Sequence, residues 1–177
     1  MSSTTALGRL RKLGYEIFYS MPGWMRRTIV RLAMAKYIMG AVAIVRDSEA
    51  AAPGRMLLLR QPPGVGWSLP AGLLERRERP IDGCVRELRE ESGIALSPDQ
   101  LSPATPSAVV HTRGQWVDMV FEASVPASTT TLRVDGAEVL EAGWHALDNL
   151  PPLTAATAHL LGYYDIGPYA DYPETRR

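Results

Sequence analysis

The sequence is poor in cysteine and lacks long apolar runs, and each shortage excludes a class of protein. The single cysteine, Cys84, cannot form an internal disulfide and has no partner for a structural zinc site, so we expect a reducing, cytoplasmic setting. No uninterrupted apolar stretch reaches the roughly 18 residues that a membrane-spanning helix needs, because basic residues interrupt the N-terminal candidate. The sequence therefore predicts no transmembrane segment.

Net charge is also missing, since 19 Lys and Arg balance 19 Asp and Glu over 177 residues. No basic excess draws the whole chain to nucleic acid, so we expect no stable nucleic-acid binding. The first 36 residues nevertheless hold seven basic side chains and one acidic one, Glu16. This start predicts a helical arm, and it also fits a transit peptide or a helix on an anionic membrane. An apolar arm can also pair two subunits, so a homodimer stays open.

Patterning predicts one α/β (α+β) domain, a mixed β-sheet between helices, preceded by the arm. The expected parts are the N-terminal helical arm at 1–36, the domain at 37–161 and an irregular C-terminal tail at 162–177. Periodicity and turn residues predict helices at 7–19, 24–37, 80–92 and 154–161, and strands at 38–46, 56–60, 108–112, 117–125 and 143–147. Loops are expected at 71–79, in the Pro/Ser-rich stretch before 108, and at a turn near 113–114.

Glutamates gather in residues 72–94, GLLERRERPIDGCVRELREESGI. On a helix, Glu87, Glu90 and Glu91 stand at i, i+3 and i+4, so they share one face. Like charges this close repel, and a hard divalent cation would explain them; oxygen-only ligands favour Mg²⁺ or Mn²⁺. The same spacing also describes an ordinary amphipathic helix with a solvated acidic face. Gly83, one turn before Glu87, would leave space for a bound phosphate.

This segment resembles the Nudix box of the Nudix (MutT-like) hydrolases: G, five residues, E, seven residues, then REUxEExGU, with U bulky and apolar. Every defined position is filled, by Gly72, Glu78, Arg86, Glu87, Leu88, Glu90, Glu91, Gly93 and Ile94. The resemblance covers about residues 37–161 and implies a Nudix hydrolase domain, with a Nudix-like mixed β-sheet sandwiched between helices. Two positions depart from the family pattern: Ala71 stands where a second glycine is common, and Arg77 where a glycine is frequent.

The resemblance implies a metal site on this helix. Glu87, Glu90 and Glu91 would bind the divalent metal with the main-chain carbonyl of Ala71. A late-loop glutamate, Glu138 with Glu141 as its rival, would complete the site or take a proton.

Other residues would shape the loop and bind substrate. Arg86 would pair with Glu75 or Glu78, and with Gly72 this would keep the loop in shape. Arg77 could reach a substrate phosphate, although a solvated loop arginine is the plainer interpretation. The expected substrate-binding residues are Arg60, Trp67, Glu75 and Asp118.

The implied activity is that of a hydrolase acting on phosphorus-containing acid anhydrides, a Nudix pyrophosphohydrolase. Water would attack phosphorus in a nucleoside triphosphate, or in a nucleoside diphosphate linked to another moiety, with Mg²⁺ or Mn²⁺ lowering the water pKa. Glu91 or the late-loop glutamate would take the proton. Oxidised nucleoside triphosphates, nucleotide sugars, ADP-ribose and CDP-alcohols all stay open as substrates.

Two alternatives share the fold. An isoprenoid diphosphate isomerase would need a reactive cysteine, and Cys84 is expected on the buried helix face. A non-catalytic nucleotide-sensing Nudix module would bind without turnover.

Overall fold

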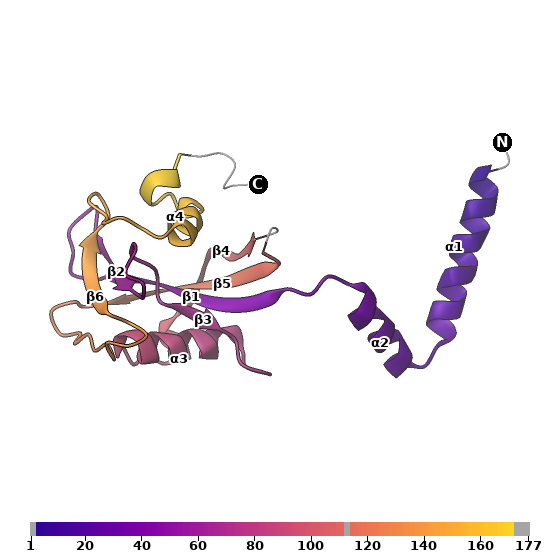
Figure 1. Ribbon diagram of the computed structural model, residues 1–177, viewed down its shortest axis with the longest axis horizontal. Helices are drawn as coiled ribbons and strands as arrows, with labels where there is room; N and C mark the ends of the chain where they lie inside the picture. Colours follow the sequence, from indigo (N-terminus) through magenta and orange to yellow (C-terminus); the bar gives the residue numbers. More distant parts are fainter. Residues whose placement is uncertain (1–2, 112–113, 172–177) are drawn as a thin grey trace. The chain divides into compact units, whose positions relative to one another are not determined.

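The computed structural model describes residues 3–111 and 114–171 and divides the chain into two compact units, residues 1–36 and 37–177 (Figure 1). The first unit contains α1 (Ser3–Ser20) and α2 (Gly23–Ala33). The second contains β1 (Ile38–Asp47), β2 (Arg55–Arg60), β3 (Ala71–Leu73), α3 (Pro80–Ser92), η1 (Pro98–Gln100), β4 (Ser102–His111), β5 (Trp116–Val125), β6 (Glu141–Ala146), α4 (Ala155–Gly162) and η2 (Gly167–Tyr169). Part of the turn expected near 113–114 lies outside the described residues.

The two helices of the first unit are separated at Pro22, which precedes the first turn of α2. The prediction that the second helix would reach residue 37 was wrong, because it ends at Ala33 and Met34 is extended at φ −92° and ψ 149°. Residues 34–36 are good helix formers, so propensity gave no stop signal here. No helix in the described part of the chain is both long and apolar enough to cross a membrane.

The centre of the second unit is a mixed sheet, as predicted, and it contains six strands, one more than the sequence indicated. Its strand order is β4-β5-β1-β2-β6, with β3 paired to β1 beside this path. The β1–β5 pair is parallel over ten residues and the other pairs are antiparallel. Residues 71–73 were expected to be loop, but they pair as β3 with residues 40–42 of β1. This pairing joins the start of the glutamate-rich segment to the centre of the sheet.

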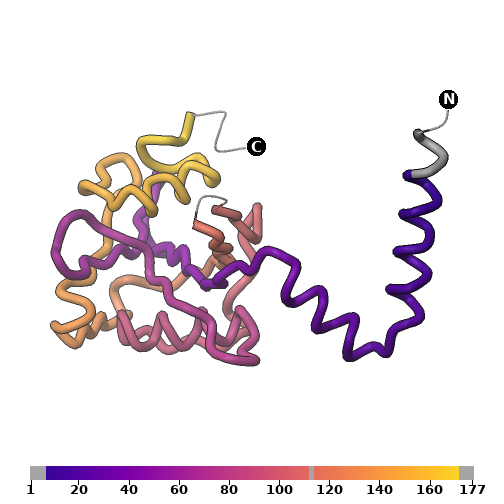
Figure 2. The backbone as a smooth tube through the Cα atoms, turned by 45° about the vertical axis from the view of Figure 1, so that its right-hand side comes forward, coloured from indigo at the N-terminus to yellow at the C-terminus, as the bar shows by residue number. Residues whose placement is uncertain are grey.

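Helices cover both faces of the sheet, as predicted, with α3 on one side and α4 on the other (Figures 1 and 2). Alternation along β1 explains this arrangement, because successive strand side chains point to opposite faces. Ala43 and Val45 pack in the cluster that contains Leu88 of α3. Val42 and Ile44 pack in the cluster that contains Leu160 and Leu161 of α4. Helix α3 is therefore fixed to the sheet by its apolar side.

Strand β4 begins six residues before the predicted start at residue 108. Pro103 and Pro106 had indicated a connection rather than a strand, because proline cannot donate a ladder hydrogen bond. β4 lies at the edge of the sheet, where proline is tolerated, and its register against β5 shifts between Pro103 and Ala108.

The region after α4 packs on the second unit as far as it is described. Ile166 is buried in the α4 cluster, and the Tyr164 hydroxyl donates to the carbonyl of Pro106 at 2.7 Å. A single 3₁₀ turn, η2, follows.

Asp47, at the end of β1, is a buried carboxylate that joins three segments. It accepts hydrogen bonds from the backbone N–H groups of Glu49 and Ala127, at 3.0 Å each, and from Arg55 Nε at 2.9 Å. Burial alone would raise its pKa, but the two backbone donors and the Arg55 guanidinium outweigh burial and lower it.

We expect Asp47→Asn to lower the free energy of unfolding at neutral pH and to flatten its dependence on acid. A carboxyl whose folded pKa is depressed stabilises the fold above its unfolded pKa, 3.8, and loses that contribution as the pH falls through the folded value. Urea denaturation at a series of pH values below 5 would measure this. The prediction would be contradicted if the free energy of unfolding fell equally steeply with decreasing pH in the variant and in the wild type.

Candidate active site

Helix α3 carries the predicted site residues, and its ends match the expected 80–92. Pro80 occupies the first turn, where a missing N–H costs little. Gly93 ends the helix with φ +77°, and its N–H donates to the carbonyl of Arg89. Cys84 and Leu88 are buried against the sheet, and burial followed by the nearby Glu87 charge raises the pKa of the Cys84 thiol to about 12. The thiol is therefore protonated at neutral pH.

Glu91 is the buried acid of the site, with only 5% of its surface exposed. Its carboxylate accepts the backbone N–H of Ala71 at 2.9 Å and the Gln61 amide at 2.6 Å. Burial raises the pKa of Glu91 to about 8, and the negative charges of Glu87 and Glu138 add to the rise, whereas the Ala71 and Gln61 hydrogen bonds oppose it. A cation placed here would relieve both the burial cost and the repulsion.

Arg86 organises the loop before the helix. Its guanidinium donates to both carboxylate oxygens of Glu78, at 3.0 and 3.1 Å, and to the carbonyl of Leu73 at 3.0 Å. Of the two expected partners, Glu75 and Glu78, Arg86 binds the side chain of Glu78. The backbone N–H of Glu75 donates to the same Glu78 carboxylate at 2.8 Å, which closes the turn.

Arg86 also contacts two of the expected metal ligands, because its Nη1 lies 2.7 Å from Glu87 and 3.1 Å from Glu90. The three glutamates share the helix face, but Glu91 points into the protein while Glu87 and Glu90 bind Arg86. Consequently, within residues 3–111 and 114–171, no three His, Cys, Asp or Glu side chains converge as a ready cation site.

The donors nevertheless fit a hard divalent cation. They offer carboxylate oxygens alone, which Mg²⁺ and Mn²⁺ prefer. Glu90 has a 60% exposed side chain that can rotate, and Glu91 is a buried acid beside the charges of Glu87 and Glu138.

Gly72 and Gly83 have different steric roles. A Cβ at Gly72 would overlap the Glu87 carboxylate, so this carboxylate occupies the space that the missing side chain leaves. A Cβ at Gly83 would lie 2.6 Å from Leu74 and 3.0 Å from Glu78. The expectation that Gly83 leaves room for a phosphate was therefore wrong, because Leu74 and Glu78 already occupy that room.

Glu138 and Glu141 differ in their surroundings. Glu138 lies near enough to Glu91 to raise its pKa. The carboxylate of Asp135 positions this loop by accepting the backbone N–H of Glu138 at 3.0 Å. Glu141 instead forms an ion pair with Arg60 at 2.7 Å. Electrostatics therefore favours Glu138 over Glu141 as the late-loop acid.

The two residues that depart from the Nudix box, Ala71 and Arg77, differ in backbone conformation. Ala71 sits in β3 without a positive φ, and its N–H serves Glu91. Arg77 adopts φ +71°, the left-handed region in which glycine is favoured. The frequent glycine at that position therefore has a conformational reason, and Arg77 departs from it at a cost in strain.

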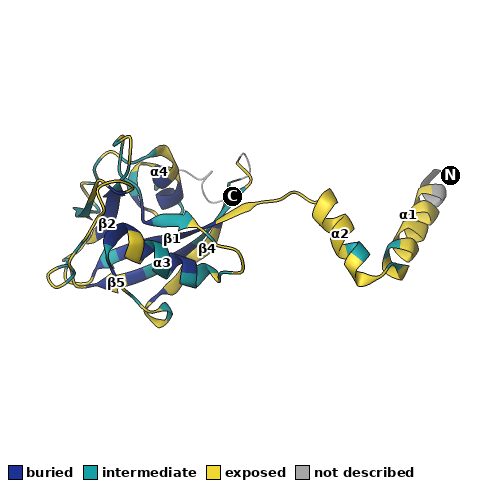
Figure 3. Ribbon diagram, turned by 60° about the horizontal axis from the view of Figure 1, so that its bottom comes forward, coloured by how far each residue is buried: buried dark blue, intermediate teal, exposed yellow. Residues whose placement is uncertain are grey.

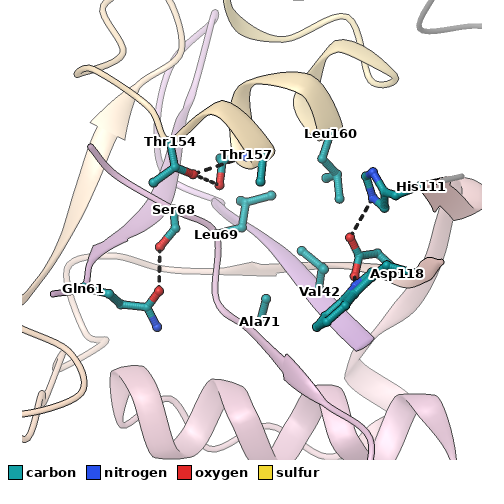
Figure 4. A pocket seen from close by; sticks show the side chains of 12 residues that line it. Val42, Gln61, Ser68, Leu69, Ala71, His111, Asp118, Thr154, Thr157 and Leu160 are labelled. Atoms are coloured by element: carbon teal, nitrogen blue, oxygen red, sulfur yellow. Dashed lines mark hydrogen bonds and ion pairs between the residues drawn. The ribbon is translucent and has the colours of Figure 1, made fainter. Parts of the chain in front are cut away.

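A pocket of about 380 Å³ has Gln61 and Ala71 in its wall (Figure 4). Both residues donate hydrogen bonds to the Glu91 carboxylate, which therefore lies behind this part of the wall. The pocket's other lining residues come from β1, the segment before β3, β4, β5, and α4 with its N-cap: Val42, Ser68, Leu69, His111, Trp116, Asp118, Thr154, Ala156, Thr157 and Leu160. The volume falls in the range of small-molecule sites.

Asp118 is the acidic group of this pocket. Its carboxylate accepts hydrogen bonds from the Trp116 indole N–H and from His111 Nε2, the latter at 2.9 Å (Figure 4). Of the four expected substrate contacts, only Asp118 lines the pocket. The sequence did not predict Gln61, His111 and Thr154 as pocket residues. Pairing between β4 and β5 is the signal that could have placed His111 near Asp118.

The other expected substrate contacts lie elsewhere. Trp67 packs edge-on against His145, with ring centroids 4.2 Å apart, and the Arg60 guanidinium lies 6.0 Å from the Trp67 ring centroid. The Glu75 side chain is exposed in the loop before α3. These three residues do not line the pocket that contains Asp118.

We expect Arg86→Lys to lower the free energy of unfolding by about 1–3 kcal/mol, because lysine keeps the charge but loses the fork that binds Glu78, Leu73 and Glu87 together. Urea denaturation would measure the change. Arg89→Lys, an exposed change on the same helix, is the matched control and should stay within about 0.5 kcal/mol of the wild type. Equal effects of the two changes would refute the organising role of Arg86.

Comparison with known proteins gives a family match over most of the chain. The profile of the NUDIX domain family matches residues 36–164. A crystal structure of a MutT NUDIX hydrolase from Burkholderia pseudomallei is 31% identical, with a TM-score of 0.54, and the alignment covers 70% of this chain and 94% of that one.

Two curated relatives match over shorter segments. A MutT-like protein of Streptomyces ambofaciens is 43% identical over 49 residues, which are 28% of this chain and 32% of the relative. The human 8-oxo-dGDP phosphatase is 36% identical over 92 residues, which are 50% of this chain and 27% of the relative. The chain therefore spans about a third or less of the length of these two proteins.

Proposed function

Because the chain belongs to the NUDIX domain family of hydrolases, we propose that it catalyses divalent-metal-dependent hydrolysis of a diphosphate bond in a nucleoside triphosphate or a derivatised nucleoside diphosphate. The observation that carries the proposal is that the buried acid, Glu91, is bound by residues of the pocket wall. Gln61 and Ala71 bind the Glu91 carboxylate and also line the cavity beside it. A nucleoside in this cavity would have its phosphates directed at the glutamates of α3.

Glu87, Glu90 and Glu91, with the carbonyl of Ala71, would hold Mg²⁺ or Mn²⁺. When bound, such a cation lowers the pKa of water and neutralises charge on phosphate oxygens. Glu91, oriented by the Gln61 amide and the Ala71 N–H, would accept a proton from the attacking water, with Glu138 as the second candidate. Arg86 would keep the loop at Glu78 in place throughout.

We propose that Asp118 binds the base of the substrate and that this base is guanine or a derivative of guanine. The carboxylate of Asp118 offers hydrogen-bond acceptors, and lone pairs remain after its bonds to Trp116 and His111. Guanine presents adjacent N–H donors on its Watson–Crick edge, which suit a carboxylate. The name of the human relative, 8-oxo-dGDP phosphatase, makes oxidised guanine nucleotides the first compounds to test.

We expect Asp118→Asn to raise KM for guanine nucleotides by about tenfold, in line with the roughly 1–3 kcal/mol that a good base contact contributes, and to change kcat little. Steady-state kinetics on guanine and adenine nucleotides would separate the two effects. Glu122→Gln, also in β5 but paired with Arg46 outside the pocket, is the control. If KM rose equally for guanine and adenine nucleotides, Asp118 would have no role in recognising the base.

The function itself is tested with the full chain, Mg²⁺ and a panel of oxidised and normal nucleoside di- and triphosphates, ADP-ribose, nucleotide sugars and CDP-alcohols. Mass spectrometry in heavy-oxygen water would identify the products and the phosphorus attacked. We expect release of a nucleoside monophosphate that stops with a chelator and returns with Mg²⁺. Nucleotide binding without turnover across the panel would overturn the proposal in favour of a sensing module.

A further inference from the structure

The N-terminal helical arm, residues 1–36, which contains α1 and α2, has many basic side chains and little acidic charge of its own. Residues 1–36 contain seven Lys and Arg residues, whereas Glu16 is their only acid. Glu16 is already engaged, because Lys12 Nζ lies 3.8 Å from its carboxylate. The arm therefore carries a net positive charge, which an anionic surface would attract.

Helix α1 separates its apolar and polar side chains. Leu10, Leu13 and Ile17 follow each other at spacings of three and four residues, which puts them on one face. Lys12 and Glu16 lie on a different face. The apolar face is open, since Leu10 is 67% exposed.

Helix α2 repeats this arrangement more sharply. Met25, Ile29 and Leu32 share one side, whereas Arg27 and Arg31 lie on the other. Leu32 is 78% exposed, and α2 contains no buried residue (Figure 3). A short helix with this division of side chains gains stability only when an apolar surface covers one side while water or anions surround the other.

Aromatic side chains with a polar edge lie among the basic side chains of the two helices. Trp24, Tyr15 and Tyr19 are all exposed, and the Arg26 guanidinium lies 5.8 Å from the Tyr19 ring centroid. Tryptophan and tyrosine beside arginine are favoured where an apolar layer meets phosphate groups, because each residue has one apolar and one polar part.

We propose that the helical arm binds the surface of an anionic lipid bilayer, lying in the headgroup layer with its apolar faces toward the acyl chains. Lipid phosphates would neutralise the arginines, and the hydrocarbon boundary would cover the leucines and isoleucines in the same contact. Nucleic acid would satisfy the charge and leave the apolar faces open. This proposal does not depend on the proposed hydrolase activity.

The test uses the full chain and vesicles of phosphatidylcholine, with or without phosphatidylglycerol. Binding is expected only to the vesicles that contain phosphatidylglycerol. The triple change Arg26→Gln, Arg27→Gln, Arg31→Gln should lower the partition coefficient about a hundredfold, since each basic side chain near an anionic surface contributes about fivefold. The matched control, Arg76→Gln, Arg89→Gln, Arg133→Gln, removes the same charge from exposed positions in the second unit and should bind like the wild type.

A second variant tests the apolar contact. Leu10→Gln with Ile17→Gln keeps every charge and should also lose binding. Trp24 fluorescence should shift to the blue on the anionic vesicles, and Trp24→Phe should remove this shift while binding persists. Circular dichroism would verify that each variant keeps its fold.

Three results would overturn the proposal: equal binding to neutral and anionic vesicles, full binding by the triple arginine variant, or no vesicle binding by the wild type. Sedimentation would then identify a second copy as the partner if the wild type self-associates without lipid and the Leu10→Gln, Ile17→Gln variant does not.

Discussion

Replacing Glu91 with glutamine is expected to lower kcat by about 10²–10⁴-fold while the melting temperature stays the same or rises. The two effects have one cause. Glu91 is an acid held in a buried position beside the negative charges of Glu87 and Glu138, which raises its pKa to about 8. Glutamine has the same shape and can still accept the Ala71 N–H, but it has no charge to desolvate and cannot take a proton.

Single-turnover kinetics and thermal melting of the same samples would test this prediction. Asp82→Asn is the matched control, because it removes a carboxylate from the first turn of α3 that pairs with Arg79 outside the site. The control should keep wild-type kcat. Wild-type turnover by Glu91→Gln, or a large loss of its stability, would show that Glu91 is a structural acid only.

Gly72→Ala is expected to lower kcat about a hundredfold through a single methyl group. The added Cβ would overlap the Glu87 carboxylate, so this side chain must move away from β3. A displacement of about 1 Å in a reacting arrangement can cost that factor. We expect the KM for nucleotide to change little, since the pocket around Asp118 is untouched, and the Mg²⁺ concentration needed for half-maximal rate to rise.

Mg²⁺ titrations of the rate would separate these effects. Gly114→Ala is the control, because among the described residues no atom beyond its chain neighbours lies within 4 Å of the Cβ that it would add. An active Gly72→Ala protein with an unchanged Mg²⁺ requirement would mean that Glu87 tolerates the shift.

The sequence predicted the parts of the fold that local chemistry determines. Helix α3 was bounded correctly because Pro80 and Gly93 are constrained by their own backbones. β4 was found only in part, since the tolerance of Pro103 and Pro106 depends on the strand lying at a sheet edge. β3 was missed because three residues carry too little pattern, and its pairing with β1 is a long-range contact.

The candidate site divides in the same way. A spacing rule brings the glutamates of α3 to one helix face, so the sequence could identify them. The pocket combines Gln61, His111 and Thr154, which lie far apart in the chain and meet only through sheet pairing and the position of α4. The attachment of Glu87 and Glu90 to Arg86 was also missed, because side-chain partners within a crowded acidic face follow from three-dimensional packing.

Arg86 gives the site an internal counter-ion. Its single positive charge lies next to the carboxylates of Glu78, Glu87 and Glu90, so the polypeptide itself offsets part of the negative charge of this turn. Folding would then proceed without any dissolved ion, and loading of the site would exchange one positive partner for another. Under the proposed function, a cation would displace the Arg86 guanidinium from Glu87 and Glu90, while the bond from Arg86 to Glu78 keeps the loop in place.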